Sequence, residues 1–332
     1  MNLRRLSIPC ISLTGIALTS LTACASHAAS TLGSLDAVLP SVPAGAPAKR
    51  QLLLYAGGPN QNVVGVYPAR SYNPPPQLEI RSGLNVPTGI AVDASGYVYI
   101  CNNAGTGATA VEPMGKGTWT VGVYHRGQTT PFESYTTGVW NPVDVAVASD
   151  GTVYIANYSS AVTVYPAGSL QPSMSLAGPS GESPLGVALD GSRNVYVSYV
   201  NPSRGGSIYK YAPGQSSGSD LGIAFSGSPH GLAIDRGGNL LVAVSTAPSP
   251  GSSIEVFPPG KTHPKKTITG VFQPFMLAFG RGGRQLFAAD FGSGNGDGGV
   301  FRFAYPAGTL LGKDTQGPAG SAYGIALDVT SK

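Results

Sequence analysis

Charged residues are scarce in this chain of 332 residues. Lys, Arg, Asp and Glu together make up 11% of it, against about 25% in typical soluble domains. The surface must therefore be built largely from Ser, Thr, Asn, Gln and Gly, which suits an exported protein. The formal net charge is only +4, and so small an excess gives no reason to expect nucleic acid as a partner.

Cysteine and histidine are also rare. Of the three cysteines, Cys10 and Cys24 lie near the N-terminus, so Cys101 has no partner for a disulfide in the rest of the chain. Cys101 takes the place that Ala156 and Ser198 hold in the repeat described below, and we expect it to be a small buried residue. The four histidines are too scattered to form a Cys/His zinc cluster with it.

After residue 50, no segment keeps the 3.6-residue apolar period of an amphipathic helix. The chain instead repeats a phrase, Pro-x-Gly followed by an alternating apolar strand and Asp. The glycine-equivalent positions are 89, 144, 186, 231, 276 and 324, with Asp144 and Met276 replacing glycine, and the steps between them are 55, 42, 45, 45 and 48 residues. Periods of this size are typical of solenoids, propellers and arrays.

A second pattern interleaves with the first: an alternating strand that ends in an aromatic residue and Pro-Ala-Gly, as in residues 162–168. Four short strands in each unit predict a propeller blade. The chain enters at a second strand (51–55) and leaves at a first strand (324–329). We therefore predict an all-β, six-bladed β-propeller over residues 51–332, in which both ends pair within one composite blade and close the ring.

Residues 87–100 read Pro-Thr-Gly-Ile-Ala-Val-Asp-Ala-Ser-Gly-Tyr-Val-Tyr-Ile. This phrase, with residues 150–157, resembles the NHL-repeat family of six-bladed β-propellers. The resemblance implies the fold and leaves the function open, because such propellers serve as scaffolds, binders and enzymes. The repeat aspartates precede tight turns, so we expect them to accept hydrogen bonds from turn amides; they are Asp93, Asp190, Asp235 and Asp328.

The N-terminus predicts export. Residues 1–23 have a basic start and a short apolar stretch, as in a signal peptide. They end in Leu-Thr-Ala before Cys24, which resembles a bacterial lipobox and implies cleavage before Cys24 and lipidation of that residue. Ordinary signal cleavage near Ala23 or Ala29, with Cys24 present by chance, is the alternative.

Residues 24–50 are rich in Ala, Ser and Pro and show no strand pattern. We predict that they form a flexible tether between the lipid and the propeller. The expected location is the bacterial cell envelope, at the outer membrane, and the expected state is a monomer anchored to the membrane through Cys24.

Candidate ligand-binding residues follow from the repeat. In the resembling families, the residue between Pro and Gly points to the mouth of the central channel; here these residues are Thr88, Val143, Leu185, His230, Phe275 and Tyr323. A second ring, at the ends of the second strands, includes Asn102, Asn157 and Asp290. An aromatic mouth with few polar groups suits a small amphipathic ligand or a peptide side chain. The alternative is that Phe275 and Tyr323 plug the channel and His230 caps a strand.

A catalytic interpretation depends on His230 as a general base with Asp290 as its orienting carboxylate. Propellers similar to gluconolactonase and regucalcin hold a divalent metal on Asn and Asp at the Pro-x-Gly position, and this chain has neither there, which disfavours a metal-dependent lactonase. Asp290, Asn295 and Asp297 could wrap a calcium ion, but their spacing does not match an EF-hand loop. We therefore expect no cofactor.

The densest basic run is Lys261-Thr262-His263-Pro264-Lys265-Lys266. It is predicted to be a solvated loop, with contact to anionic lipid headgroups or polysaccharide as the alternative. The main functional hypothesis is a non-enzymatic binding or scaffold module for an envelope protein, peptide or glycan. A lactonase-like hydrolase or lyase and a purely structural envelope component are the alternatives.

Overall fold

The computed structural model describes residues 51–103, 119–201, 205–246, 250–293 and 295–328. They belong to one compact unit, Lys49–Lys332. The predicted signal peptide, the tether and Cys24 lie outside the described residues. In the part of the chain that is described, no helix has the length and apolar character needed to cross a membrane.

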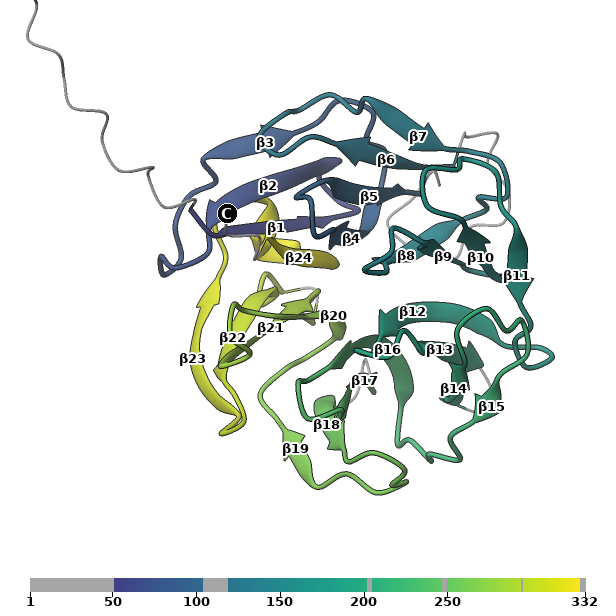
Figure 1. Ribbon diagram of the computed structural model, residues 1–332. Coiled ribbons are helices and arrows are strands. Elements are labelled where there is room, and N and C mark those ends of the chain that lie inside the picture. Colours follow the sequence, from purple (N-terminus) through teal and green to yellow (C-terminus); the bar gives the residue numbers. More distant parts are fainter. Residues whose placement is uncertain (1–50, 104–118, 202–204, 247–249, 294, 329–332) are drawn as a thin grey trace, which may run out of the picture. The chain divides into compact units, whose positions relative to one another are not determined.

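The described residues form six antiparallel sheets of four strands, the blades, arranged around a ring (Figure 1). From the inside outwards, blade 1 contains β24 (Gly324–Asp328), β1 (Leu53–Gly58), β2 (Val63–Pro68) and β3 (Leu78–Ile80). Blade 2 contains β4 (Pro87–Val92), β5 (Val98–Asn102), β6 (Thr120–Tyr124) and β7 (Glu133–Tyr135). Blade 3 contains β8 (Pro142–Val147), β9 (Val153–Asn157), β10 (Val162–Tyr165) and β11 (Met174–Leu176).

Blade 4 contains β12 (Ser183–Leu189), β13 (Val195–Asn201), β14 (Gly205–Tyr211) and β15 (Ser219–Asp220). Blade 5 contains β16 (Ser228–Ile234), β17 (Leu240–Ser245), β18 (Ser253–Phe257) and β19 (Lys266–Ile268). Blade 6 contains β20 (Pro274–Phe279), β21 (Gln285–Asp290), β22 (Gly299–Ala304) and β23 (Thr309–Asp314), and a short 3-10 turn, η1 (Gly317–Ser321), leads into β24. The predicted fold is confirmed, with the first strand of every phrase innermost.

The ring closes as predicted, through both ends of the unit. Strand β24 pairs antiparallel with β1, from Leu53 opposite Asp328 to Gly57 opposite Gly324. The inner strands of successive blades also pack against one another, including β20 against β24 and β24 against β4. All four strands of each described sheet therefore come from this one chain.

The hydrophobic core is divided among the blade interfaces. The described residues contain six apolar clusters, and each one joins two neighbouring blades. Period-2 alternation explains this: in β1, Leu53 and Tyr55 face blade 2, whereas Leu54 and Ala56 face blade 6. The inner strands are therefore largely apolar on both sides, and neighbouring blades pack against one another through them.

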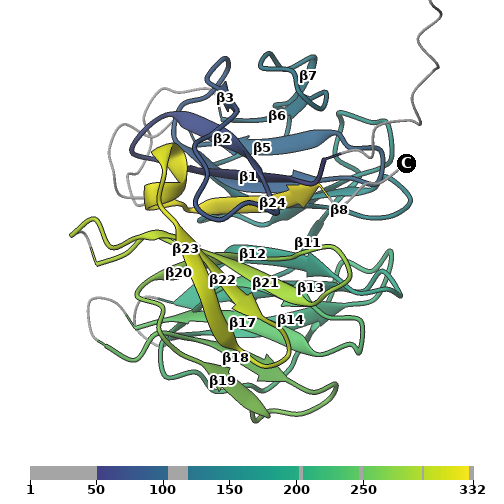
Figure 2. The same cartoon turned by 90° about the vertical axis from the view of Figure 1, so that its left-hand side faces the viewer.

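The ring has two distinct faces, which Figure 2 shows from the side. We call the face where the inner strands start, at the Pro-x-Gly phrases, the top face. The bottom face carries the turns between the first and second strands. There Asp93, Asp190 and Asp235 cap the turns as predicted. The turn predicted after Asp328 lies outside the described residues. Asp93, for example, accepts hydrogen bonds from the Ser95 and Tyr97 amides, both at 2.9 Å. Gly96 completes that turn with φ +89°, a conformation that favours glycine.

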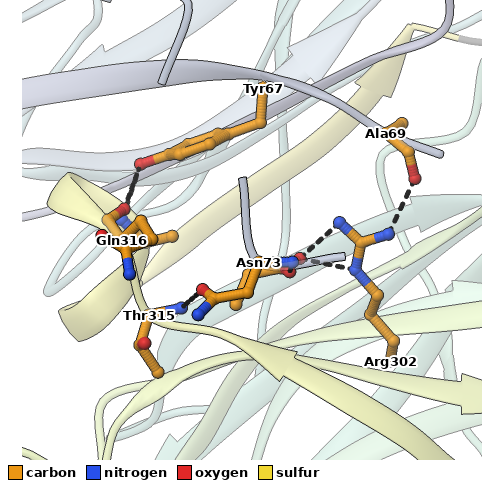
Figure 3. A network of polar contacts seen from close by, with 8 residues as sticks. Tyr67, Ala69, Asn73, Arg302, Thr315 and Gln316 are labelled. Carbon is orange, nitrogen blue, oxygen red and sulfur yellow. Dashed lines mark hydrogen bonds and ion pairs between the residues drawn. The ribbon is translucent and has the colours of Figure 1, made fainter. Parts of the chain in front are cut away.

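A buried polar network joins blade 6 to blade 1 (Figure 3). The Nε and Nη2 atoms of Arg302 lie 2.5 Å from Oδ2 of Asp314, and Nη1 donates to the Ala69 carbonyl at 2.8 Å. The backbone amide of Asn73 donates to Oδ1 of Asp314 at 2.6 Å. The side-chain oxygen Oδ1 of Asn73 accepts from the backbone amide of Thr315 at 2.7 Å. We call these residues the closure clasp, because they join segments more than 230 residues apart in the chain.

On the bottom face, Arg126 of blade 2 adds a second connection to the closing strands. Its Nε donates to Asp328 at the end of β24, and its Nη2 donates to the Gln51 carbonyl just before β1. One guanidinium therefore holds both ends of the composite blade at the same point.

Candidate functional site

The Pro-x-Gly phrase places its middle residue by a β-bulge. In blades 2 to 6, the register of the inner strand against the second strand shifts at this phrase. A bulge inserts an extra residue and redirects its side chain. Thr88, Val143, Leu185, His230 and Tyr323 are buried at these positions, and Phe275 is half-buried.

Three of these side chains form a continuous aromatic stack. The rings of His230 and Phe275 lie 4.7 Å apart between centroids at 17°, and those of Phe275 and Tyr323 lie 3.8 Å apart at 25°. The three residues come from blades 5, 6 and 1, so the stack crosses two blade interfaces. His230 is 9% exposed and Tyr323 is 4% exposed. The stack therefore fills the space between the inner strands and leaves mainly Phe275 accessible.

The polar residues of the same ring bind the next blade. Thr88 Oγ1 donates to the Pro142 carbonyl at 2.8 Å, and His230 Nδ1 lies 3.2 Å from the Pro274 carbonyl. Each proline begins the phrase of the following blade, so the two contacts are equivalent. The polar groups of Thr88 and His230 therefore connect neighbouring blades.

The side chains of His230 and Asp290 have separate hydrogen-bond partners. Burial lowers the pKa of His230 to about 4, so the ring is neutral at pH 7. The carboxylate of Asp290 accepts hydrogen bonds from the amides of Phe272 (2.7 Å), Gln273 (3.0 Å) and Gly292 (2.8 Å). Among the described residues, no hydrogen bond joins it to His230. Burial raises the pKa of Asp290 and these amides act against the shift.

Asn102, Asn157 and Asp290 share one structural task. Each ends a second strand, and each accepts a hydrogen bond from the amide two residues before the proline of its own blade. Asn102 binds the Asn85 amide, Asn157 binds the Trp140 amide at 2.8 Å, and Asp290 binds the Phe272 amide. These three buried side chains therefore fix the loops that enter the inner strands on the top face.

Two of the candidate calcium ligands, Asn295 and Asp297, bind the same residue, Ser293. Both carboxylate oxygens of Asp297 accept from Ser293, at 2.6 Å from its amide and 2.7 Å from its hydroxyl. Asn295 Nδ2 donates to the same hydroxyl at 3.1 Å. Outside the masked gaps, the structure has no group of three or more His, Cys, Asp or Glu residues that could hold a metal ion. The loop is shaped by its own hydrogen bonds.

Asp144 is a buried carboxylate that sequence reasoning assigned no role. It lies at a glycine position of the repeat, where Oδ1 accepts from the Val145 amide and Oδ2 from the Val187 amide of the next blade, both at 2.9 Å. Burial raises its pKa to about 7, and the two amides act against the shift. Cys101 lies close by and is fully buried, which raises the pKa of its thiol. The only sign in the sequence that this position is unusual is that Asp144 replaces the glycine of the repeat.

The loops held by Asn157 and Asp290 carry exposed aromatic side chains. Trp140 is 42% exposed and Phe272 is 48% exposed. Trp140 packs against the half-buried Trp119 with ring centroids 4.1 Å apart, and Phe275 contacts the half-buried Phe291 edge-on at 6.3 Å. We call Trp119, Trp140, Phe272, Phe275 and Phe291 the top-face aromatic group. The group contains two contacting pairs, Trp119 with Trp140 at blades 2 and 3 and Phe275 with Phe291 at blade 6.

Solved structures share the fold. A chain from the crystal structure of a nidogen/laminin complex is 17% identical with a TM-score of 0.66, over 85% of this chain and 100% of that one. A Bacteroides caccae protein of unknown function is 14% identical with a TM-score of 0.60, over 84% of this chain and 99% of that one. A Bacteroides fragilis protein described as a candidate 6-phosphogluconolactonase is 11% identical with a TM-score of 0.58, over 84% and 98%. No protein-family model and no curated protein matches the sequence.

Proposed function

We propose that this six-bladed propeller is a non-enzymatic binding module that recognises a protein or peptide partner through its top-face aromatic group. The main support for this proposal is that the side chains of Trp140 and Phe272 are exposed although their backbone positions are fixed. The buried side chain of Asn157 accepts a hydrogen bond from the Trp140 amide, and that of Asp290 accepts one from the Phe272 amide. Large aromatic side chains are enriched among residues that dominate binding energy. Fixing them before binding lowers the conformational entropy lost in the complex.

The filled axis supports a surface rather than a reaction cavity. A hydrolase or lyase at this mouth would need a base with a pKa near the working pH, whereas His230 is buried and neutral and Asp290 binds loop amides. The fold is shared with a propeller from a complex between two proteins, which is consistent with protein binding. At this level of identity the likeness supports the fold alone.

The predicted lipobox at Cys24 supplies the second part of the proposal. Lipidation there would anchor the module at the cell envelope, at the outer membrane, and would confine its partner to proteins or peptides met at that surface. Mass spectrometry of the protein from its own cells would test this part, since a lipidated Cys24 gives an N-terminal peptide carrying the acyl mass.

Site-specific photo-crosslinking in cells tests the binding surface. A photoreactive phenylalanine analogue replaces Phe272 in the full-length protein, and a second protein carries it at Leu310. Leu310 is a matched control because it is 50% exposed and lies on the outer strand β23. We expect a discrete protein adduct from position 272 and none from position 310. Equal adducts from both positions, no adduct from either, or a glycan adduct at 272 would contradict a protein or peptide partner on the top face.

A further inference from the structure

A pocket of about 530 Å³ lies on the bottom face between blades 5 and 6. Its walls are the turn after β16 (Asp235 to Gly237), the turn after β20 (Gly280 to Arg284), and Tyr305 with Pro306 at the end of β22. These are the first-to-second strand turns of two neighbouring blades, so the position of the pocket follows from the repeat. It lies on the face opposite the aromatic group.

Three arginines line this pocket: Arg236, Arg281 and Arg284. All three are exposed, and within the described residues none of them forms an ion pair. Three other arginines, Arg126, Arg193 and Arg302, pair with aspartates. The pocket therefore collects three guanidinium groups, none of which is in an ion pair with a described residue.

The acidic residue in the wall is already engaged. Asp235 accepts hydrogen bonds from the Tyr305 hydroxyl at 2.6 Å and from Asn239 Nδ2 at 2.7 Å. It also accepts from the Gly237 and Asn239 amides, both at 2.8 Å. Its single negative charge offsets one of the three arginine charges, so the pocket wall keeps a net positive charge.

The basic run of the sequence adjoins the same pocket. Lys261 and Lys265 lie in the connection between β18 and β19, on the bottom face of blade 5, and Lys266 begins β19. Lys265 Nζ donates to Asn239 Oδ1 at 2.7 Å, and Asn239 in turn binds Asp235 in the pocket wall. Six cationic side chains are thus gathered on blades 5 and 6, in a protein whose formal charge is only +4.

We propose that this basic pocket binds the phosphate group of an anionic lipid headgroup at the membrane surface. The planar fork of arginine suits a phosphate oxygen pair, and lysines beside it favour a surface of negative charge. The bottom face is also where Gln51 enters the propeller, held by Arg126, so the chain that leads back to Cys24 joins the propeller on this side. That the ligand carries a phosphate group is inferred from the pocket alone. That this phosphate belongs to a membrane lipid rests on the proposed membrane anchoring.

Vesicle co-sedimentation of residues 49–332 tests the proposal. This unit contains the complete ring with both closing strands, and it lacks Cys24, so acylation cannot contribute. We expect binding to vesicles of phosphatidylglycerol with phosphatidylcholine and none to phosphatidylcholine alone. Arg281→Gln should weaken binding about fivefold, and Arg281→Gln with Arg284→Gln about 25-fold, as follows from about 1 kcal/mol for each basic residue near an anionic membrane.

Arg81→Gln is the matched control. It removes the same charge from a side chain that is 63% exposed, paired with Glu79, and placed after β3 on the top face. Binding that falls equally in Arg81→Gln and Arg281→Gln would overturn the pocket as the site, as would the absence of any loss. Saturable binding of inorganic phosphate without vesicle binding would overturn the lipid source.

The two proposals fail separately. The crosslink expected at Phe272 lies on the opposite face and should persist in the double arginine variant. Loss of vesicle binding in that variant, with the crosslink unchanged, would assign the two faces to two different ligands.

Discussion

Replacing Arg302 with Met should destabilise the closed ring by about 3–5 kcal/mol, the range measured when one partner of a buried ion pair is removed. The side chains of Arg302 and Asp314 are 6% and 0% exposed. Methionine would keep much of the aliphatic volume and remove the charge, leaving the Asp314 carboxylate buried without a counter-ion. The Ala69 carbonyl would lose its donor as well.

The loss should depend on pH in a defined direction. Burial raises the pKa of Asp314, and Arg302 acts against that shift. Without Arg302 the folded-state pKa would rise further above the unfolded value, so the variant would be least impaired at low pH and would lose stability as the pH increases. Adding Asp314→Asn should recover part of the loss, because no charge then remains buried and the Asn73 amide keeps an acceptor.

Urea unfolding of residues 49–332, followed by circular dichroism, measures these differences. The expected loss corresponds to a melting temperature lower by about 10 °C, at roughly 2–4 °C per kcal/mol for domains of this class. Arg81→Met is the control, because its surface pair with Glu79 contributes about 0–1 kcal/mol. A loss in Arg302→Met no larger than in Arg81→Met would refute the role of the closure clasp.

Two further predictions concern buried polar groups at the blade interfaces. Asp144→Asn should remove a pH dependence of stability, because burial raises the folded-state pKa of Asp144 from its ordinary value of 3.8 to about 7. The wild type should therefore lose up to about 4 kcal/mol of stability as the pH rises through that window. Denaturation at pH 4 and pH 7 should show a smaller difference in the variant. An unchanged profile would mean that Asp144 is solvated. Asn157→Ala should cost about 1–3 kcal/mol by leaving buried groups unpaired, and amide hydrogen exchange at Trp140, whose amide Asn157 accepts, should speed up. Unaltered exchange at that amide would contradict the capping role.

The fold could be predicted because each unit repeats the same local signals. Pro-x-Gly, alternation and the Asp turn all indicate the same strand order, and the phase of the first and last copies predicts the pairing of Leu53 with the region of Asp328. The resemblance to a repeat family also predicts that the residue between Pro and Gly lies near the axis of the ring. The register shift that redirects this residue occurs within the phrase itself.

The use of those residues was harder to predict. The repeat indicates that His230 and Phe275 both lie near the axis of the ring. Whether their rings line an open cavity or stack on each other depends on the distance between them, and that distance depends on packing across three blades. The donors to Asn157 and Asp290 are backbone amides, which carry no sequence signal. The arginine pocket joins turns from two blades, so it appears only when their spacing is known.

The central claim is that the axis is closed by the stack of His230, Phe275 and Tyr323, so that the top face binds partners as a surface. Titration of the His230 ring by nuclear magnetic resonance, assigned with a His230→Gln variant, tests this most directly. A closed axis predicts a midpoint near 4, set by burial of the ring. A midpoint at the ordinary histidine value, about 6.5, would show an imidazole open to solvent and would contradict the account.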